Sequence, residues 1–216
     1  MVRYSTASGR PSRPRLLLTG FGPFPGAPRN PTAEVVARLA ERGVGDRLGV
    51  DIVPHVFSTT WSALDDLAGL LAEARPDIVL HLGLKRRARS IAVETFGRNR
   101  VSMAAVDAEG RRPRGSVLDG DAPPRLASTL PVRRIAIRIA GLGLPVEVST
   151  DAGRYLCNGL LWQSLRLSGE RPTGFLHLPP TRETTVVAQG VFTLDALTRA
   201  TAAAISIAAG RGALQP

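Results

Sequence analysis

A single cysteine, Cys157, is the residue of this chain best suited to act as a nucleophile. It lies in the segment 149–159, whose residues predict a strand end, a short polar turn and the first turn of a helix. The positive end of a helix dipole favours the thiolate, which is the nucleophilic form of cysteine. A lone cysteine is, however, more often a small apolar residue of a core. Nucleophilic chemistry would also need an imidazole that moves a proton and a third group that orients it.

The best candidate for the imidazole is His177, which follows the cysteine by 20 residues. It lies at the end of a predicted strand, close to Pro179 and Pro180, where a side chain can face a cleft. We expect His55 and His81 to be core or surface residues whose hydrogen bonds are satisfied locally. The sequence therefore singles out one histidine of three.

The candidate for the third group is Glu94, a carboxylate that directly follows the apolar run 91–93. An unpaired charge among buried apolar residues would be costly. A structural ion pair with Arg86, Arg87 or Arg89 would explain this carboxylate as well as a catalytic role does. Both interpretations stay open on the pattern alone.

Metal and nucleotide sites are not indicated. One cysteine and three dispersed histidines lack the spacing of metal ligands. The segment 20–22 is not followed by the Gly, Lys and Ser or Thr of a phosphate-binding loop, and a dinucleotide-binding fingerprint is also missing. We expect neither a metal nor a nucleotide cofactor.

The chain is strongly basic, with a formal net charge of +10, which suggests a nucleic-acid partner at first sight. All but one of its 28 basic residues are arginines, and they are scattered along the whole sequence. Aromatic residues that could stack on bases are not interleaved with them. We therefore expect a solvated, arginine-rich surface and no nucleic-acid partner.

Length and composition predict one soluble domain. A chain of 216 residues, 44% of them hydrophobic, can bury a sizeable core, and with 5% aromatic residues that core must be aliphatic. We expect a flexible basic tail over 1–14 and a single catalytic domain over 15–216. No segment has the length of a membrane-spanning helix, and residues 1–15 lack the apolar core of a signal peptide. Together with the single cysteine, this predicts a cytoplasmic protein without a membrane partner.

Helical and strand patterns alternate along the chain, which is typical of a three-layer α/β/α sandwich around a largely parallel twisted sheet. Functional sites in such sheets gather beyond the carboxyl ends of the strands. We expect the loops 20–26, 83–94, 149–157 and 177–180 to meet there, and a long surface loop over 105–124. Strands are predicted over 15–19, 50–57, 77–83, 145–149 and 174–178, and helices over 31–42, 61–74, 131–142, 152–167 and 193–209.

Three motifs in order carry a resemblance to a known family. The segment 19–26 followed by Asn30 and Pro31, the segment around Cys157 and Asn158, and the segment 174–179 around His177 are similar to those of type I pyroglutamyl peptidase, also called pyrrolidone-carboxylate peptidase. The segment 91–94 is similar to the region around that family's glutamate. The resemblance runs from about residue 15 to residue 209.

This resemblance implies a Cys157–His177–Glu94 triad that removes an N-terminal pyroglutamyl residue from a peptide or amide. It implies that Phe21 and Phe24 grip the flat lactam ring, which would suit a neutral planar group. It also implies an α/β/α sandwich, no cofactor, a cytoplasmic location and a homo-oligomer, either a homotetramer or a homodimer.

The region between 84 and 104 departs from the family's pattern. The resemblance implies that Leu84 takes the place of a glutamine that helps to bind the lactam, and that basic residues replace glycines over 85–89. Ala104 stands near the aligned position of an arginine tied to the oxyanion site, for which Arg98 or Arg100 could substitute. Three alternatives stay open: a related enzyme for another acyl-amide, a non-catalytic relative that binds through the same cleft, and last a nucleic-acid binder.

Overall fold

The computed structural model describes residues 13–184 and 192–210. Most of the tail predicted over 1–14 lies outside the described residues. The two described residues of that tail are tied to the fold, since Arg13 pairs with Asp46 and the carbonyl of Pro14 accepts a hydrogen bond from Asp51 N–H.

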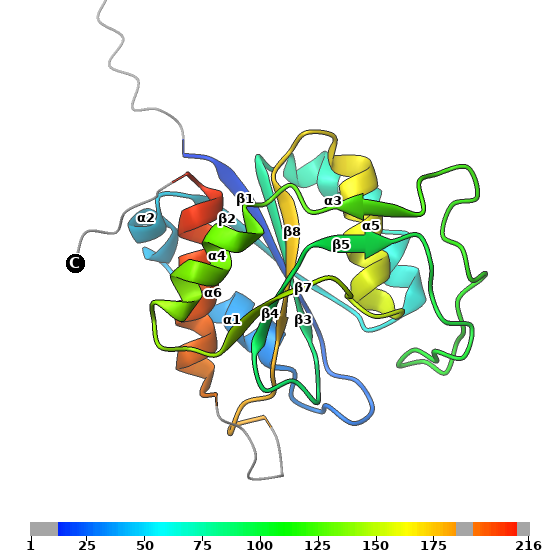
Figure 1. Cartoon of the computed structure of the whole chain (residues 1–216), viewed down its shortest axis with the longest axis horizontal. Coiled ribbons are helices and arrows are strands. Elements are labelled where there is room, and N and C mark those ends of the chain that lie inside the picture. The colour runs from blue at the N-terminus through cyan, green and yellow to red at the C-terminus, as the bar shows by residue number, and fades with distance from the viewer. Residues whose placement is uncertain (1–12, 185–191, 211–216) are drawn as a thin grey trace, which may run out of the picture.

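Six strands form one twisted sheet in the order β2-β1-β3-β8-β4-β7 (Figure 1). The first four strands in this order run parallel, whereas β4 pairs antiparallel with β8 and parallel with β7. The sheet is therefore mostly parallel but mixed, with two reversed strands at one edge. Its strands are β1 (Arg15–Phe21), β2 (Asp51–Phe57), β3 (Ile78–Leu84), β4 (Ile91–Glu94), β7 (Val146–Ser149) and β8 (Thr173–Leu178).

Helices cover both faces of the sheet, so the predicted three-layer α/β/α sandwich is confirmed (Figure 1). One face is covered by α1, α4 and α6, with the short α2 beside them, and the other by α3 and α5 (Figure 1). Their bounds are α1 (Pro31–Leu39), α2 (Val44–Leu48), α3 (Leu67–Ala74), α4 (Val132–Ala140), α5 (Leu156–Ser168) and α6 (Leu194–Ala208).

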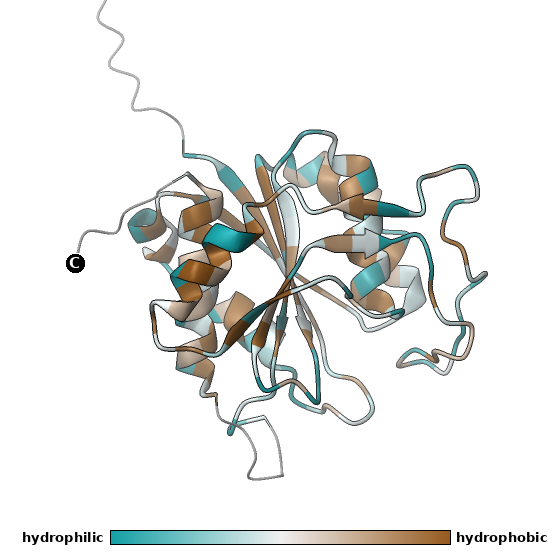
Figure 2. Cartoon of the chain, in the orientation of Figure 1, coloured by the Kyte–Doolittle hydropathy of each residue, from teal (hydrophilic) through white to brown (hydrophobic). Residues whose placement is uncertain are grey.

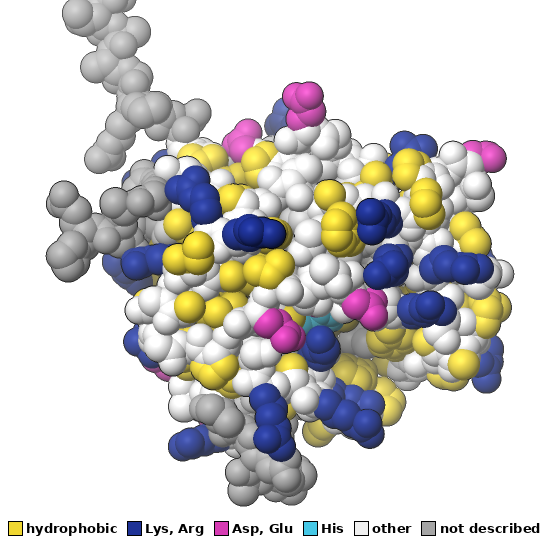
Figure 3. All heavy atoms as spheres, in the orientation of Figure 1, with side chains coloured by type: hydrophobic (Ala, Val, Ile, Leu, Met, Phe, Trp, Pro, Cys, Tyr) yellow, Lys and Arg dark blue, Asp and Glu magenta, His cyan; other side chains and the backbone are white. Residues whose placement is uncertain are grey.

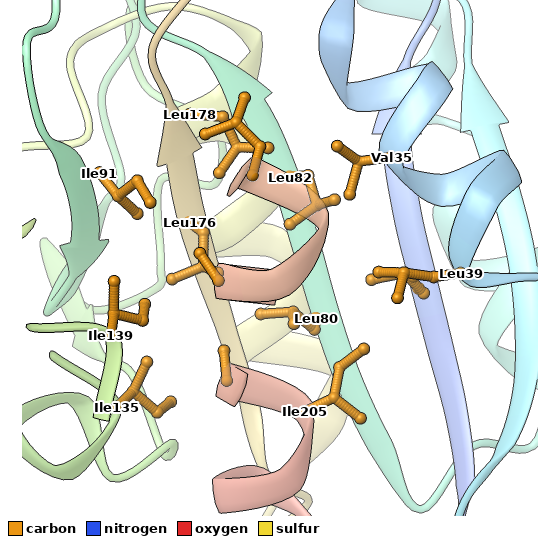
Figure 4. Close-up of a cluster of buried hydrophobic side chains, with 14 of the residues drawn as sticks. Val35, Leu39, Leu80, Leu82, Ile91, Ile135, Ile139, Leu176, Leu178 and Ile205 are labelled. Atoms are coloured by element: carbon orange, nitrogen blue, oxygen red, sulfur yellow. The ribbon is translucent and has the colours of Figure 1, made fainter. Parts of the chain in front are cut away.

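Alternation along the central strands builds two aliphatic cores. Leu16 and Leu18 face the α1–α6 side, where Leu80 and Leu82 also pack, whereas Leu17 faces α3 and α5. Figure 4 shows the larger cluster, with leucines of β3 and β8 between isoleucines of α4 and α6. The apolar faces of the helices turn towards the sheet (Figure 2), as amphipathic helices on a buried sheet must.

Local sequence signals explain where several helices begin. Asn30 caps α1, because its side chain accepts a hydrogen bond from Thr32 N–H and Pro31 stands at the first helical position. Thr193 caps α6 in the same way through Ala196 N–H. Asparagine and threonine are both among the residue types favoured at this position.

The predicted helix over 61–74 is wrong as a single element. It is split into a 3-10 turn η1 (Trp61–Leu64) and α3, with Asp65 and Asp66 between them. The apolar spacing that runs through both pieces gives no sign of this break.

The predicted helix over 152–167 begins too early, because α5 starts at Leu156. Residues 152–155 form an irregular bend with Gly153 at φ 80°, and Cys157 is the second residue of the helix. The small sheet of β5 (Phe96–Arg98) and β6 (Arg125–Ala127) was not predicted, nor was β4, which was assigned to a loop. These three strands are at most four residues long, too short for an alternating pattern to stand out.

The reversed edge also corrects the expected position of the loops. β1, β3 and β8 end at one edge of the sheet, as predicted, but β4 and β7 run the other way. The loop 149–157 therefore starts level with the middle of β8 and approaches the site from the side. None of the described helices is both long and apolar enough to cross a membrane.

Candidate active site

A buried carboxylate–imidazole pair lies at the junction of β8 and β4. Ala92 stands directly opposite His177 in the antiparallel register, so Glu94 is its diagonal neighbour on the same face. His177 Nδ1 lies 2.7 Å from Glu94 Oε1, and both side chains are almost fully buried. Because a carboxylate can only accept here, Nδ1 carries the proton and Nε2 is left to face a substrate or nucleophile.

Cys157 faces this pair from the first turn of α5. Cys157 and His177 line one cleft, and the charge of the nearby Cys157 acts on the imidazole. Burial alone would lower the pKa of His177, but the facing Cys157 and the Glu94 carboxylate outweigh it and raise this pKa to about 9. The imidazole is thus set to hold a proton at neutral pH.

The thiol rests directly on the backbone of β3. A Cβ atom at Gly83 would lie 2.7 Å from Cys157 Sγ and 2.6 Å from the Phe175 ring, both far inside contact distance. Gly83 is the register partner of His177 on the adjacent strand. The absence of a side chain at this position therefore lets the thiol come down beside the imidazole.

A cleft of about 500 Å³ opens onto these two residues. Figure 3 shows a histidine at the bottom of a hollow, with acidic side chains on two sides and a basic one beside it. The cleft walls come from the end of β3, from β7 and from the β7–α5 loop. It is lined by Leu84, Lys85, Glu147, Val148, Ser149, Thr150, Asp151, Ala152, Gly153 and Tyr155 beside Cys157 and His177.

The aromatic wall of the cleft is held by the long loop predicted over 105–124. The Tyr155 hydroxyl donates to Val106 O (3.2 Å), and the Tyr155 ring meets Trp61 edge-on at 5.4 Å. Burial and the nearby Asp107 and Cys157 raise the pKa of Tyr155 to about 12, so its hydroxyl stays protonated. The long loop is thereby tied to the residue two positions before the thiol.

Asn158 connects α5, the helix that carries Cys157, to the chain that follows Glu94. Its side chain accepts from Arg98 N–H (2.8 Å) and donates to the carbonyls of Arg98 (2.9 Å) and Arg100 (2.8 Å). The Asn158 side chain is fully buried, and both its oxygen and its nitrogen form hydrogen bonds. It therefore holds these two segments of the chain together. The sequence motif contained Asn158, but only the structure reveals this contact.

The proposed ring-binding residues lie at the β1 end. Phe21 is buried against Phe57, with ring centres 6.0 Å apart, and Phe24 is half-buried with the Arg86 guanidinium 6.0 Å from its ring centre. Leu84 lines the cleft, whereas neither phenylalanine is among its lining residues. A ring-gripping role for them stays a prediction.

The two arginines offered for the oxyanion site differ in position. Arg98 donates to Thr150 O (3.2 Å) and lies 3.7 Å from Asp151, so it buttresses the loop that walls the cleft. Arg100 and Ala104 are exposed and are not among the lining residues. Of the two, Arg98 is the one attached to the cleft.

The other two histidines serve the core and the edge, as expected. His81 is buried between the hydroxyls of Thr19 (2.7 Å) and Ser164 (2.9 Å), and burial lowers its pKa to about 3. His55 lies edge-on to Phe57 on the outer strand β2. Within the described ranges, no three His, Cys, Asp or Glu side chains cluster closely enough to hold a metal ion.

One family of known proteins matches this chain over most of its length. A model of the pyroglutamyl peptidase family matches residues 14–211. The chain belongs to the pyroglutamyl peptidase family. It is therefore similar to cysteine-type peptidases over almost its whole length.

Sequence relatives and solved structures agree. The pyrrolidone-carboxylate peptidase of Chromobacterium violaceum is 34% identical over 180 residues, covering 83% of this chain and 84% of its own. That of Streptococcus suis is 33% identical over 169 residues, covering 76% and 77%. The crystal structure of Bacillus amyloliquefaciens pyroglutamyl peptidase I superposes with a TM-score of 0.82 at 30% identity, covering 91% of this chain and 97% of its own.

Substituting Gly83 tests how the thiol is seated. In Gly83→Ala the new methyl group displaces Cys157 Sγ or the Phe175 ring, so we expect a loss of stability of about 1–3 kcal/mol and slower alkylation of the thiol by iodoacetamide. Gly69→Ala is the matched control, because nothing lies within 4 Å of a Cβ there, and alanine favours its helix α3. Alkylation as fast in Gly83→Ala as in the control would contradict this account of the seat.

Proposed function

We propose that this chain hydrolyses the amide bond after an N-terminal pyroglutamyl residue, with Cys157 as nucleophile, His177 as proton carrier and Glu94 as the group that orients the imidazole. The observation that carries this proposal is the 2.7 Å His177–Glu94 pair, which faces the chain's one cysteine in a single cleft. Membership of the pyroglutamyl peptidase family supports the same reaction.

In this mechanism, Cys157 Sγ attacks the carbonyl carbon of the scissile bond and forms a tetrahedral intermediate. His177 Nε2 then gives its proton to the departing amine, and the acyl-enzyme thioester forms. Water, deprotonated by the same imidazole, attacks the thioester and regenerates the thiol. Glu94 keeps Nδ1 protonated throughout and stabilises the imidazolium, which is the role of a triad carboxylate.

The oxyanion of the intermediate is stabilised by backbone N–H groups at the start of α5, whose first residues have no helical acceptor. One such donor typically contributes roughly 3 kcal/mol. Arg98 supports this site from outside by holding the loop at Thr150 and Asp151. The lactam itself is gripped by Leu84 and, on the β1 side, by Phe21 and Phe24.

A second candidate function keeps this chemistry but changes the acyl group. It is favoured by Leu84, which presents an apolar wall to the cleft where the family resemblance implies a glutamine. A panel of amides with pyroglutamyl, prolyl and N-acetyl groups separates the two candidate functions. If the apolar wall selects another acyl group, the amide of that group should be hydrolysed faster than the pyroglutamyl amide.

We further propose that the chain works in the cytoplasm as a homo-oligomer, a tetramer or a dimer. Its single cysteine suits a reducing compartment. Support for self-association comes from the outer edge of the sheet, where Ile137 of α4 is 72% exposed and Val148 of β7 is 43% exposed. Hydrophobic side chains gather over this part of the face drawn in Figure 3, and such patches mark contact surfaces.

Removal of the thiol tests the mechanism directly. We expect the purified chain to hydrolyse pyroglutamyl aminomethylcoumarin, and Cys157→Ser and Cys157→Ala to lose at least about a thousandfold in kcat. Ser206→Ala, a hydroxyl on α6 on the far side of the sheet, is the control that should leave turnover unchanged. Turnover retained in Cys157→Ala would rule out a cysteine nucleophile.

The pH dependence follows from the raised pKa of His177. Below about pH 9 the imidazole keeps the proton that the leaving amine needs, and above it that proton is lost, so kcat/KM should fall about tenfold per pH unit beyond 9. Glu94→Gln removes a charge that raises this pKa, so the fall should begin at a lower pH. Glu73→Gln, exposed on α3, should leave the profile where it is; an alkaline limb that does not move in Glu94→Gln would contradict the assigned role.

Light scattering of the purified chain tests the assembly. We expect the mass of a dimer or tetramer, and we expect Ile137→Asp to reduce it to that of a monomer, because a charge would be buried in the contact. Leu167→Asp is the control, since Leu167 is 50% exposed at the end of α5, away from this edge. A monomeric wild-type chain would refute the proposal.

A further inference from the structure

We propose that Lys85 is a specificity-determining residue that selects substrates with a carboxylate in the residue directly after the scissile bond. This inference rests on the proposed function and names the substrate class that the cleft favours. Lys85 is the only lysine in a chain whose other cations are all arginines, and it lies in the wall of the cleft that holds Cys157 and His177.

The order of the strands shows which side of the cleft receives the leaving group. Cys157 lies over Gly83 of β3, and His177 is on the next strand, β8. Since His177 must protonate the departing amine, that amine lies on the β8 side of the thiol, away from β1. The part of the substrate after the scissile bond therefore extends over β8 and β4 towards β7.

The Lys85 ammonium points into this half of the cleft. Its Nζ is 3.9 Å from Oε1 of Glu147, which belongs to β7, three places from β3 in the sheet. The side chain of Lys85 therefore reaches from the end of β3 across the mouth of the cleft. A peptide that leaves the thiol towards β7 must pass beside this ammonium.

The contact between Lys85 and Glu147 is weak enough to be exchanged. It is at the outer limit of a salt bridge, and the two side chains are 45% and 51% exposed. Ion pairs of this kind contribute little, since water screens them and both side chains lose freedom. A substrate carboxylate placed closer than 3.9 Å can replace Glu147 without leaving a buried charge unpaired.

The surroundings of Lys85 reinforce its preference for an anion. Arg86, Arg87 and Arg89 follow it on the exposed turn between β3 and β4. Among the described residues, none of these three arginines has a carboxylate within salt-bridge distance. A turn with unneutralised cations at the mouth creates a positive potential that attracts anionic peptides.

The second carboxylate of the cleft does not cancel this effect. Asp151 lies 3.7 Å from Arg98 Nε, a cation outside the cleft, and it is not within salt-bridge distance of Lys85. Glu147 is the only lining carboxylate within salt-bridge distance of Lys85 among the described residues. An acidic side chain of the substrate thus competes with one group alone.

Three peptide amides that differ in one side chain test this inference: pyroglutamyl-glutamyl amide, pyroglutamyl-glutaminyl amide and pyroglutamyl-lysyl amide. The released amino-acid amide is quantified by chromatography. We expect kcat/KM for the glutamyl substrate to exceed that for the glutaminyl one about fivefold, the size expected of one exposed ion pair. The difference should lie in KM, because the contact is present in both ground and transition states.

Matched variants assign the preference to one side chain. Lys85→Gln should make kcat/KM equal for the glutamyl and glutaminyl substrates. Glu147→Gln should increase the preference for the glutamyl substrate, because it removes the carboxylate that competes for Lys85. Arg133→Gln removes a cation from α4 on the opposite face of the sheet and should change nothing. Raising the salt concentration to about 0.5 M should shrink the preference in the wild type, since exposed charges are screened.

Equal rates for the glutamyl and glutaminyl substrates, or a preference that persists in Lys85→Gln, would overturn the inference. The readout is independent of the proposed function, because binding of the same three peptides to Cys157→Ala can be measured by calorimetry. A glutamyl preference in binding that requires Lys85, without turnover by the wild type, would support the role of Lys85 and refute the hydrolytic reaction. Turnover of all three peptides at equal rates would support the hydrolytic reaction and refute the role of Lys85.

Discussion

The buried hydrogen bond between Glu94 and His177 is the interaction on which the rest of this structure depends. A carboxylate without any solvent exposure is stable only beside a cation or strong donor, and the imidazole supplies both. In turn, the charge of the carboxylate and the facing thiol keep the imidazole protonated. Each of the two groups would be an unfavourable buried residue without the other, so they must be brought together by rigid elements.

The reversal of β4 achieves this. An antiparallel neighbour places Glu94 diagonally across from His177 on the face that carries α5. Had β4 continued the parallel pattern, the chain would have had to cross the sheet before pairing, and the carboxylate would have entered from the other direction. The antiparallel pairing of β4 with β8 is therefore required to form the Glu94–His177 pair.

Bringing the thiol to this pair needs a second set of constraints, since it comes from a helix and not from the sheet. Gly83 allows α5 to approach β3 closely enough for sulfur to sit beside the imidazole. Asn158 then fixes the first turn of α5 to the chain that leaves Glu94. Cys157 and Glu94 are thus linked through hydrogen bonds between the Asn158 side chain and the backbone that follows Glu94.

These constraints explain what could be predicted from the sequence. Long buried strands such as β1 and β3, and the capped helices α1 and α6, carry strong local patterns and were recognised. The short strands β4, β5 and β6 are set by partners distant in the sequence, and no local pattern reveals them. The three residues of the proposed triad were selected through their types and the family motifs, whereas the importance of Gly83 and Asn158 is evident only from their close contacts in three dimensions.

The proposed catalytic residues and the proposed specificity residue also differ in how strongly the fold constrains them. Cys157, His177 and Glu94 are held by buried strands, a helix start and a glycine, so a change at any supporting position disturbs several contacts at once. Lys85 and its neighbouring arginines lie on an exposed turn, whose backbone only has to join β3 to β4. A chain can exchange residues on such a turn with little effect on its stability. The basic turn at the mouth of the cleft is therefore the part of this site that can vary without disturbing Cys157, His177 and Glu94, which agrees with the specificity role proposed for Lys85.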